Sequence, residues 1–122
     1  MAEELKTMAG QAVFVCATDG PLVAGEADAL DVIGGLWGLD ADWFALPVSR
    51  LSADFLNLST GLAGAVIQKF VTYQLRLAIV GDISVAVAAS DALRDFVRES
   101  NAGRHVCFVA DLAALEALFA AG

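Results

Sequence analysis

The chain has 122 residues, which suits one domain, and 58% of them are hydrophobic, which is enough to fill a core. Its net charge of −8 excludes the basic surface that nucleic acids and anionic membranes require of a partner. No apolar run approaches the roughly 20 residues of a membrane span, and the acidic stretch Met1 to Lys6 is unlike a signal peptide. We therefore expect a single domain over residues 1–122 with a cytoplasmic location.

Two apolar runs open the chain and predict a hairpin. Residues 5–8 and 11–17 flank the short turn Ala9-Gly10. The second run is continuously apolar, as expected for a central strand that is covered on both faces. Thr18-Asp19-Gly20-Pro21 then ends the strand.

The middle of the chain alternates helix and strand signals. Apolar residues at helical spacing, with acids in the first turn, predict a helix over 26–37. A strand follows over 43–48, where Pro47 indicates that the strand stops or lies near an edge. Residues 52–58 are expected to be irregular or a short helical turn, and 61–73 to be an amphipathic helix.

The second half continues the alternation. We expect a strand over 75–80, a helix over 90–101 capped by Ser90, a strand over 106–110 and a last helix that begins at Asp111. Residues 85–89 are apolar without clear periodicity. They predict either an extra buried turn or a contact between copies through Val85 and Val87.

The order β-β-α-β-α-β-α-β-α predicts an α/β fold: a mixed, mostly parallel five-stranded sheet with about four helices. Loops after parallel strands gather at one edge of the sheet, where binding sites usually lie. These loops carry Asp19, the Ser59-Thr60-Gly61 step, Asp82 and Asp111. Each also has a plain structural interpretation, since Asp19 suits a turn and Ser59, Thr60 and Asp111 suit helix caps.

The Ser59-Thr60-Gly61 step is the most informative local feature. A helix start leaves backbone N–H groups unpaired, so a hydroxyl there can cap the helix, or it can carry or recognise a phosphate. Behind this step, four small or slim residues share one side of the expected helix and can let another surface approach closely: Gly61, Gly64, Ala65 and Gln68.

Catalytic and metal chemistry find little support in the sequence. His105 is the single histidine, and no serine lies in a nucleophile-elbow pattern. P-loop and Rossmann glycine patterns are absent. Cys16 and Cys107 lie in strand-like runs and are expected to be reduced, buried thiols. We expect no cofactor, no metal and no enzyme activity, with an Asp19–Asp82 metal site as the weaker alternative.

Three segments resemble a bacterial family of domains of unknown function, DUF4180. They are residues 54–64, residues 68–70 together with 77–82, and residues 93–101. The order of elements and the step Leu58-Ser59-Thr60-Gly61-Leu62 also resemble the STAS domain of bacterial anti-sigma factor antagonists, whose loop reads Asp-Ser-Ser-Gly-Leu. By this resemblance Thr60 matches the phosphorylated position and Ser59 the hydroxyl before it, while Leu58 stands where the STAS pattern has aspartate.

The STAS resemblance implies a non-enzymatic regulatory module whose protein partner is a kinase-like anti-sigma factor. Phosphate at Thr60 would then act as a switch. A small-ligand or nucleotide binder that uses Asp19, Thr60 and Asp82 at the edge of the sheet is the alternative, and a small enzyme is the third hypothesis.

Overall fold

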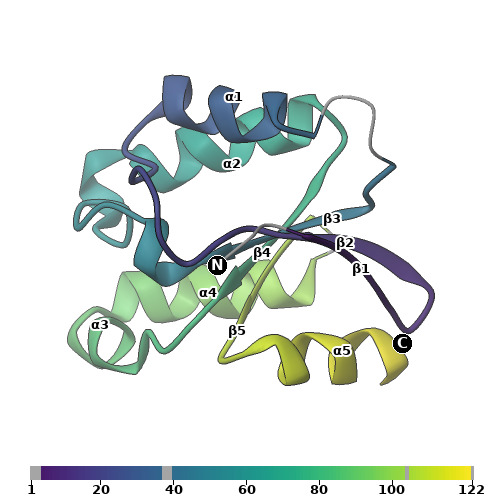
Figure 1. The fold of residues 1–122 in the computed structure, drawn as a ribbon. Helices are drawn as coiled ribbons and strands as arrows, with labels where there is room; N and C mark the ends of the chain where they lie inside the picture. Colours follow the sequence, from purple (N-terminus) through teal and green to yellow (C-terminus); the bar gives the residue numbers. More distant parts are fainter. Residues whose placement is uncertain (1–3, 37–39, 104, 122) are drawn as a thin grey trace.

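The computed structural model describes residues 4–36, 40–103 and 105–121 and has the expected α/β architecture (Figure 1). Five strands form one sheet in the order β1-β2-β3-β4-β5, with β1 antiparallel to β2 and the other neighbours parallel. The elements are β1 (Glu4–Met8), β2 (Gln11–Val15), α1 (Glu26–Gly34), β3 (Trp43–Pro47), the 3-10 helices η1 (Val48–Arg50) and η2 (Leu58–Thr60), α2 (Leu62–Thr72), β4 (Arg76–Val80), α3 (Ser84–Ala89), α4 (Asp91–Ala102), β5 (Val106–Val109) and α5 (Leu112–Ala121).

The hairpin of β1 and β2 turns through Ala9 and Gly10, whose φ angles are 48° and 84°. Two consecutive positive φ values are typical of a type I′ turn, whose twist matches that of the flanking strands. The register runs without a bulge from Met8 opposite Gln11 to Glu4 opposite Val15.

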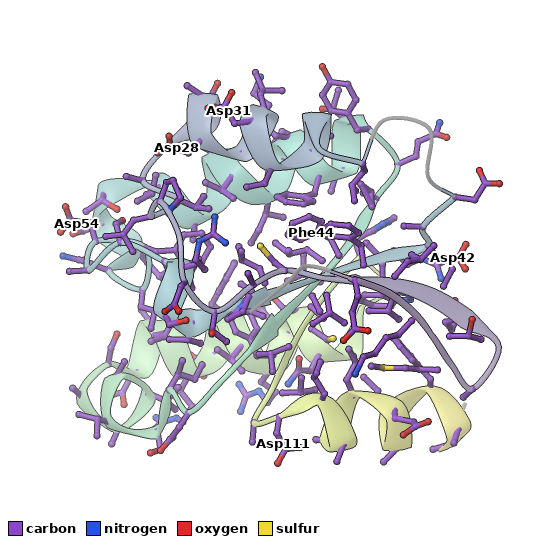
Figure 2. All side chains as sticks on the ribbon, viewed as in Figure 1. Asp28, Asp31, Asp42, Phe44, Asp54 and Asp111 are labelled. Carbon is purple, nitrogen blue, oxygen red and sulfur yellow. The ribbon has the colours of Figure 1, made fainter. Side chains whose placement is uncertain are left out.

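The main core lies between one face of the sheet and helices α1, α2 and α4. Aromatic rings form its centre: Phe44 of β3 stacks on Phe14 of β2 at 5.5 Å between ring centroids and meets Phe70 of α2 at 5.3 Å. Figure 2 shows Phe44 in the interior, between the sheet and the two upper helices. Phe44 and Phe70 are fully buried.

The other face of the sheet packs against α5. Leu115 is fully buried there with Ala78 and Cys107, and the Trp43 ring meets Phe119 at 5.1 Å between centroids. In Figure 1, α5 runs along the side of the sheet opposite α1 and α2. None of the helices in the described ranges combines the length and the apolar character needed to cross a membrane.

Several expected boundaries differ from the structure. Helix α1 ends at Gly34 and does not reach residue 37, and residues 37–39 lie outside the described ranges. Pro47 does end its strand, but β3 is the central strand and not an edge. The segment 52–58, expected to be irregular or a short helical turn, forms turns over 53–56, and η2 begins only at its last residue, Leu58.

The apolar segment 85–89 is helical, so the described residues hold five α-helices where about four were expected. Asp82 accepts a hydrogen bond from the Ser84 amide at 2.9 Å, which starts α3. Val85 is 83% exposed, so the expectation of a buried turn is wrong for this side chain. Val87 is half-buried, and the expected contact between copies through Val85 and Val87 stays a prediction.

The outer edge of β5 is covered by a side chain. The Phe108 amide donates to Oδ1 of Asn101 at 2.7 Å, and Nδ2 of Asn101 donates to the Phe108 carbonyl at 3.4 Å. We expect Asn101→Ala to lower the free energy of unfolding by about 1–2 kcal/mol, because both groups of Phe108 lose their partner. Urea denaturation measures the loss. Glu99→Ala, an exposed site on the same helix, should change stability by less than about 0.5 kcal/mol, and an equal loss would contradict the prediction.

Candidate functional site

Four loops follow the parallel strands β2, β3, β4 and β5, and the parallel pairing places their starts along one edge of the sheet. The predicted residues Asp19, Thr60 and Asp82 come from three different loops. Among the described residues, no hydrogen bond or ion pair joins any two of these three side chains. These residues therefore form separate features at this edge and not one joined cluster.

Thr60 holds the entry to α2. Its hydroxyl donates to the carbonyl of Asn57 at 2.8 Å, with the Asp54 carbonyl at 3.1 Å, and accepts a hydrogen bond from the Leu62 amide at 3.2 Å. Leu62 is the first residue of α2, so Thr60 satisfies one of the unpaired amides of the helix start. Gly61 is the N-cap residue of α2, and Thr60 supports the helix start from the position before it, as a residue that remains exposed.

Ser59 is also exposed, but it makes a different contact. Its hydroxyl donates to Oδ1 of Asn57 at 2.7 Å, and its amide donates to the same oxygen at 3.2 Å. These bonds stabilise η2 itself, and the chain then turns into α2 through Gly61, whose φ is 74°. Asn57 is a residue that the sequence analysis did not single out, although an asparagine two residues before a serine is a common turn signal.

The slim side of α2 faces outward, as predicted. Gly61, Gly64 and Gln68 are exposed and Ala65 is half-buried. A Cβ atom added at Gly61 or Gly64 would meet nothing within 4 Å. An open surface of small residues therefore extends from the Thr60 turn along the first turns of the helix.

The two acidic residues of the predicted ligand set, Asp19 and Asp82, do not share a hydrogen-bond partner among the described residues. Asp82 is exposed, and hydrogen bonds from the side chain and then the backbone of Ser84 hold its pKa below the ordinary aspartate value. Asp19 is exposed in the loop after β2. In the parts of the chain that the structure describes, no three acidic, histidine or cysteine side chains group as metal ligands would.

Arg50 is the feature that sequence reasoning missed. It is only 5% exposed, although it carries a full charge. Its Nε donates to the Pro21 carbonyl at 2.8 Å, and its Nη1 donates to the Ala17 carbonyl at 3.0 Å and to Sγ of Cys16 at 3.1 Å. None of the ion pairs among the described residues includes Arg50. The guanidinium thus binds the loop after β2 through neutral acceptors.

Gly20 makes room for this arginine. Its φ is 145°, and a Cβ atom there would lie 2.8 Å from Cζ of Arg50. The loop and the arginine therefore pack directly on each other, and a larger residue at position 20 would displace the guanidinium.

Several hollows lie at the sheet edge, and two of them adjoin the loops after β2 and β3. The smaller, of about 210 Å³, lies beside α1, and its lining includes Arg50, Asp28 and Asp31. The larger, of about 570 Å³, lies between the ends of β2, β3 and β4 and the start of α5, with an apolar lining that includes Ala45 and Leu112. Figure 2 shows Asp28 and Asp31 on α1, and Asp111 at the start of α5. Asp111 caps α5 as predicted, accepting the Ala114 amide at 2.8 Å.

Cys16 and Cys107 are buried and form no disulfide, as expected. Burial raises the pKa of the Cys107 thiol from 9.0 to about 11. We therefore expect the folded protein to shield Cys107 from iodoacetamide at pH 8 and to expose it on unfolding, as mass spectrometry of the alkylated protein would show. Rapid alkylation of the folded protein would contradict this prediction.

The raised pKa of Cys107 also implies a free energy of unfolding that falls as pH rises from about 9 towards 11. The reason is that the thiol of the unfolded chain releases its proton at a lower pH than the buried thiol does.

The fold and these features define an α/β protein with a capped hydroxyl turn, an open helix face and an arginine-bound loop at the edge of its sheet. A family model described as a domain of unknown function, DUF4180, matches residues 8–119. The chain belongs to the DUF4180 family. No curated protein and no solved structure matches it.

Proposed function

We propose that this chain is a non-enzymatic regulatory module with a STAS-like fold, which binds a protein partner through the Thr60 turn and the slim side of α2. The observation that carries the proposal is the position of Thr60. The residue is exposed, yet its hydroxyl holds together the turn that leads into the proposed surface. A change at this one group can therefore alter the surface beside it.

Phosphorylation of Thr60 would act through the hydrogen bonds of its hydroxyl. The phosphate ester lacks the proton that Thr60 donates to the carbonyls of Asn57 and Asp54, and its charge would repel both oxygens. The same charge is favoured by the unpaired amides at the start of α2. The turn would rearrange while the phosphate stays at the helix start, which changes what a partner meets next to Gly61 and Gly64.

The resemblance to anti-sigma factor antagonists supports a kinase-like anti-sigma factor as the partner. Leu58 in place of the STAS aspartate is half-buried and packs against the main core. The partner's kinase site would then recognise the exposed Ser59-Thr60 hydroxyls without an acidic residue before them.

The experiment compares binding by Thr60→Glu and Thr60→Ala, together with mass spectrometry of the native protein for phosphate at Ser59 or Thr60. We expect phosphate at Thr60 and a partner that distinguishes the two variants. Glu99 gives a matched control, because it is exposed on α4 and outside the proposed surface. Glu99→Ala removes the same kind of charge that Thr60→Glu adds and should bind like the wild type. Identical binding by the two Thr60 variants, each shown to be folded by circular dichroism, would count against the switch.

A small-ligand binding module remains the second candidate, and the larger hollow favours it. The hollow lies at the edge of the sheet where α/β proteins usually bind ligands, but Asp19, Thr60 and Asp82 are not in its lining. A thermal-shift screen with nucleotides and small apolar molecules would test it, since a ligand that binds only the folded state must raise its stability. The variant Ala110→Trp, at the hollow's exposed rim, should abolish any such shift.

A further inference from the structure

The two edge strands of the sheet, β1 and β5, differ in whether their outward backbone groups have a hydrogen-bond partner. At β5 the side chain of Asn101 occupies the outward amide and carbonyl of Phe108. At the opposite edge β1 pairs only with β2 among the described strands, without a bulge, and four of its five residues are exposed. An open, regular edge strand can accept another strand, and proteins usually block such an edge when it has no partner.

The hairpin geometry identifies which backbone groups of β1 point outward. The type I′ turn closes on the pair Met8 and Gln11, and hydrogen bonding alternates along an antiparallel pair. Glu4 and Lys6 therefore face β2 with their amides, whereas Leu5 and Thr7 present theirs to the free edge. Leu5 sits at the middle of the strand, and its side chain is 44% exposed.

The charges of β1 are self-complementary about Leu5. If a second copy of β1 pairs antiparallel to the first with a two-fold axis at Leu5, Glu4 lies opposite Lys6 of the partner subunit, and the reverse pair forms on the other side. Leu5 then exchanges amide and carbonyl hydrogen bonds with Leu5 of the partner subunit. Directly opposed charges of opposite sign stabilise such strand pairs. Within one chain Lys6 Nζ already lies 3.5 Å from Oε1 of Glu4, so the dimer would join four charges.

The apolar side of the strand also gains cover in this arrangement. Leu5 pairs with Phe14 of β2, and Phe14 lines the smaller hollow together with Leu22, which is 50% exposed. A neighbouring copy would bury Leu5 against its own equivalent on this face.

The geometry points to an antiparallel β1–β1 contact with a second copy of this chain, which joins the two sheets into one across a two-fold axis. The interface is isologous, with each copy offering the same strand. It uses neither the Thr60 turn nor the slim side of α2, so the proposed function can fail while the dimer holds, and the reverse.

Sedimentation equilibrium of the full chain tests the dimer. We expect the wild type to form dimers in a concentration-dependent way. Lys6→Glu should weaken the association by about tenfold or more, because two pairs change from attraction to repulsion. The double variant Glu4→Lys with Lys6→Glu should restore it, because the charges are complementary again. Lys69→Glu, the same charge change on α2, should associate like the wild type.

Hydrogen exchange provides a second measurement that needs no variant. The amide of Leu5 should become protected as the protein concentration rises. A wild type that stays monomeric, a Lys6→Glu variant that associates normally, or a double variant that does not recover would overturn the β1 contact. Val85→Ser should leave the dimer intact, and loss of the dimer in this variant would place the interface on α3 instead.

Discussion

Replacing Arg50 with methionine is expected to lower the free energy of unfolding by about 3 kcal/mol. Methionine fills a similar length but donates no hydrogen bond, so the carbonyls of Ala17 and Pro21 lose the donor that the structure gives them. The loop after β2 packs on this guanidinium through Gly20. We therefore expect the variant to loosen this loop and the start of α1, which follows it. Urea denaturation of both proteins measures the difference.

Two further variants separate the role of the guanidinium from that of its charge. Arg50→Lys keeps the charge, but one ammonium cannot serve the positions of both Nε and Nη1, so we expect most of the loss to remain. Arg94→Met removes an exposed arginine that pairs with Asp91 at 2.7 Å and should cost less than about 1 kcal/mol. If Arg50→Met cost no more than Arg94→Met, the arginine would not be holding the loop.

Phe44→Ala should cost about 4 kcal/mol of the free energy of unfolding. Phe44 is fully buried on the central strand and contacts the rings of both Phe14 and Phe70, so its removal leaves a cavity between the sheet and α2. Because small domains are stable by only about 5–15 kcal/mol, the variant should unfold at a much lower urea concentration.

Phe44→Leu is the matched variant, since it keeps most of the apolar volume. It should cost about 1–1.5 kcal/mol. Urea denaturation with near-ultraviolet circular dichroism reports both stability and packing of the aromatic cluster. A loss below about 1 kcal/mol for Phe44→Ala would mean that the core collapses around the site, contrary to the tight ring contacts.

The elements with strong local signals were predicted well. The continuous apolar run after Gly10 became β2, and Ser90 caps α4 through the Leu93 amide at 3.1 Å, as expected. Helix α1 shows where such signals end: apolar spacing continues to residue 37, but the helix stops at Gly34, and the Gly35 amide still reaches the Asp31 carbonyl at 3.3 Å. Adjacent glycines weaken a helix more than apolar spacing extends it.

The predicted site residues also differ in whether local sequence is enough to place them. Thr60 could be assigned to the helix start because its hydroxyl acts on neighbours within six residues. Asp19 and Asp82 were combined with it only by their place at one edge of the sheet, and no contact among the described residues joins them. The short helix α3 was missed because a six-residue apolar segment carries no clear period.

The amino-acid sequence by itself determined the order of the strands and of every α-helix except α3, the α/β class, the family and the hydroxyl turn, because each depends on residues close together in the chain. The tertiary structure decided that Arg50 is buried and that Asn101 covers one edge of the sheet while β1 leaves the other open. Arg50 meets Pro21 across 29 positions. From sequence alone a single arginine is expected to be exposed to solvent, because the carbonyls that bind it come from a distant part of the chain. The strand that lies at the edge of the sheet is likewise known only when the pairing of all the described strands is known.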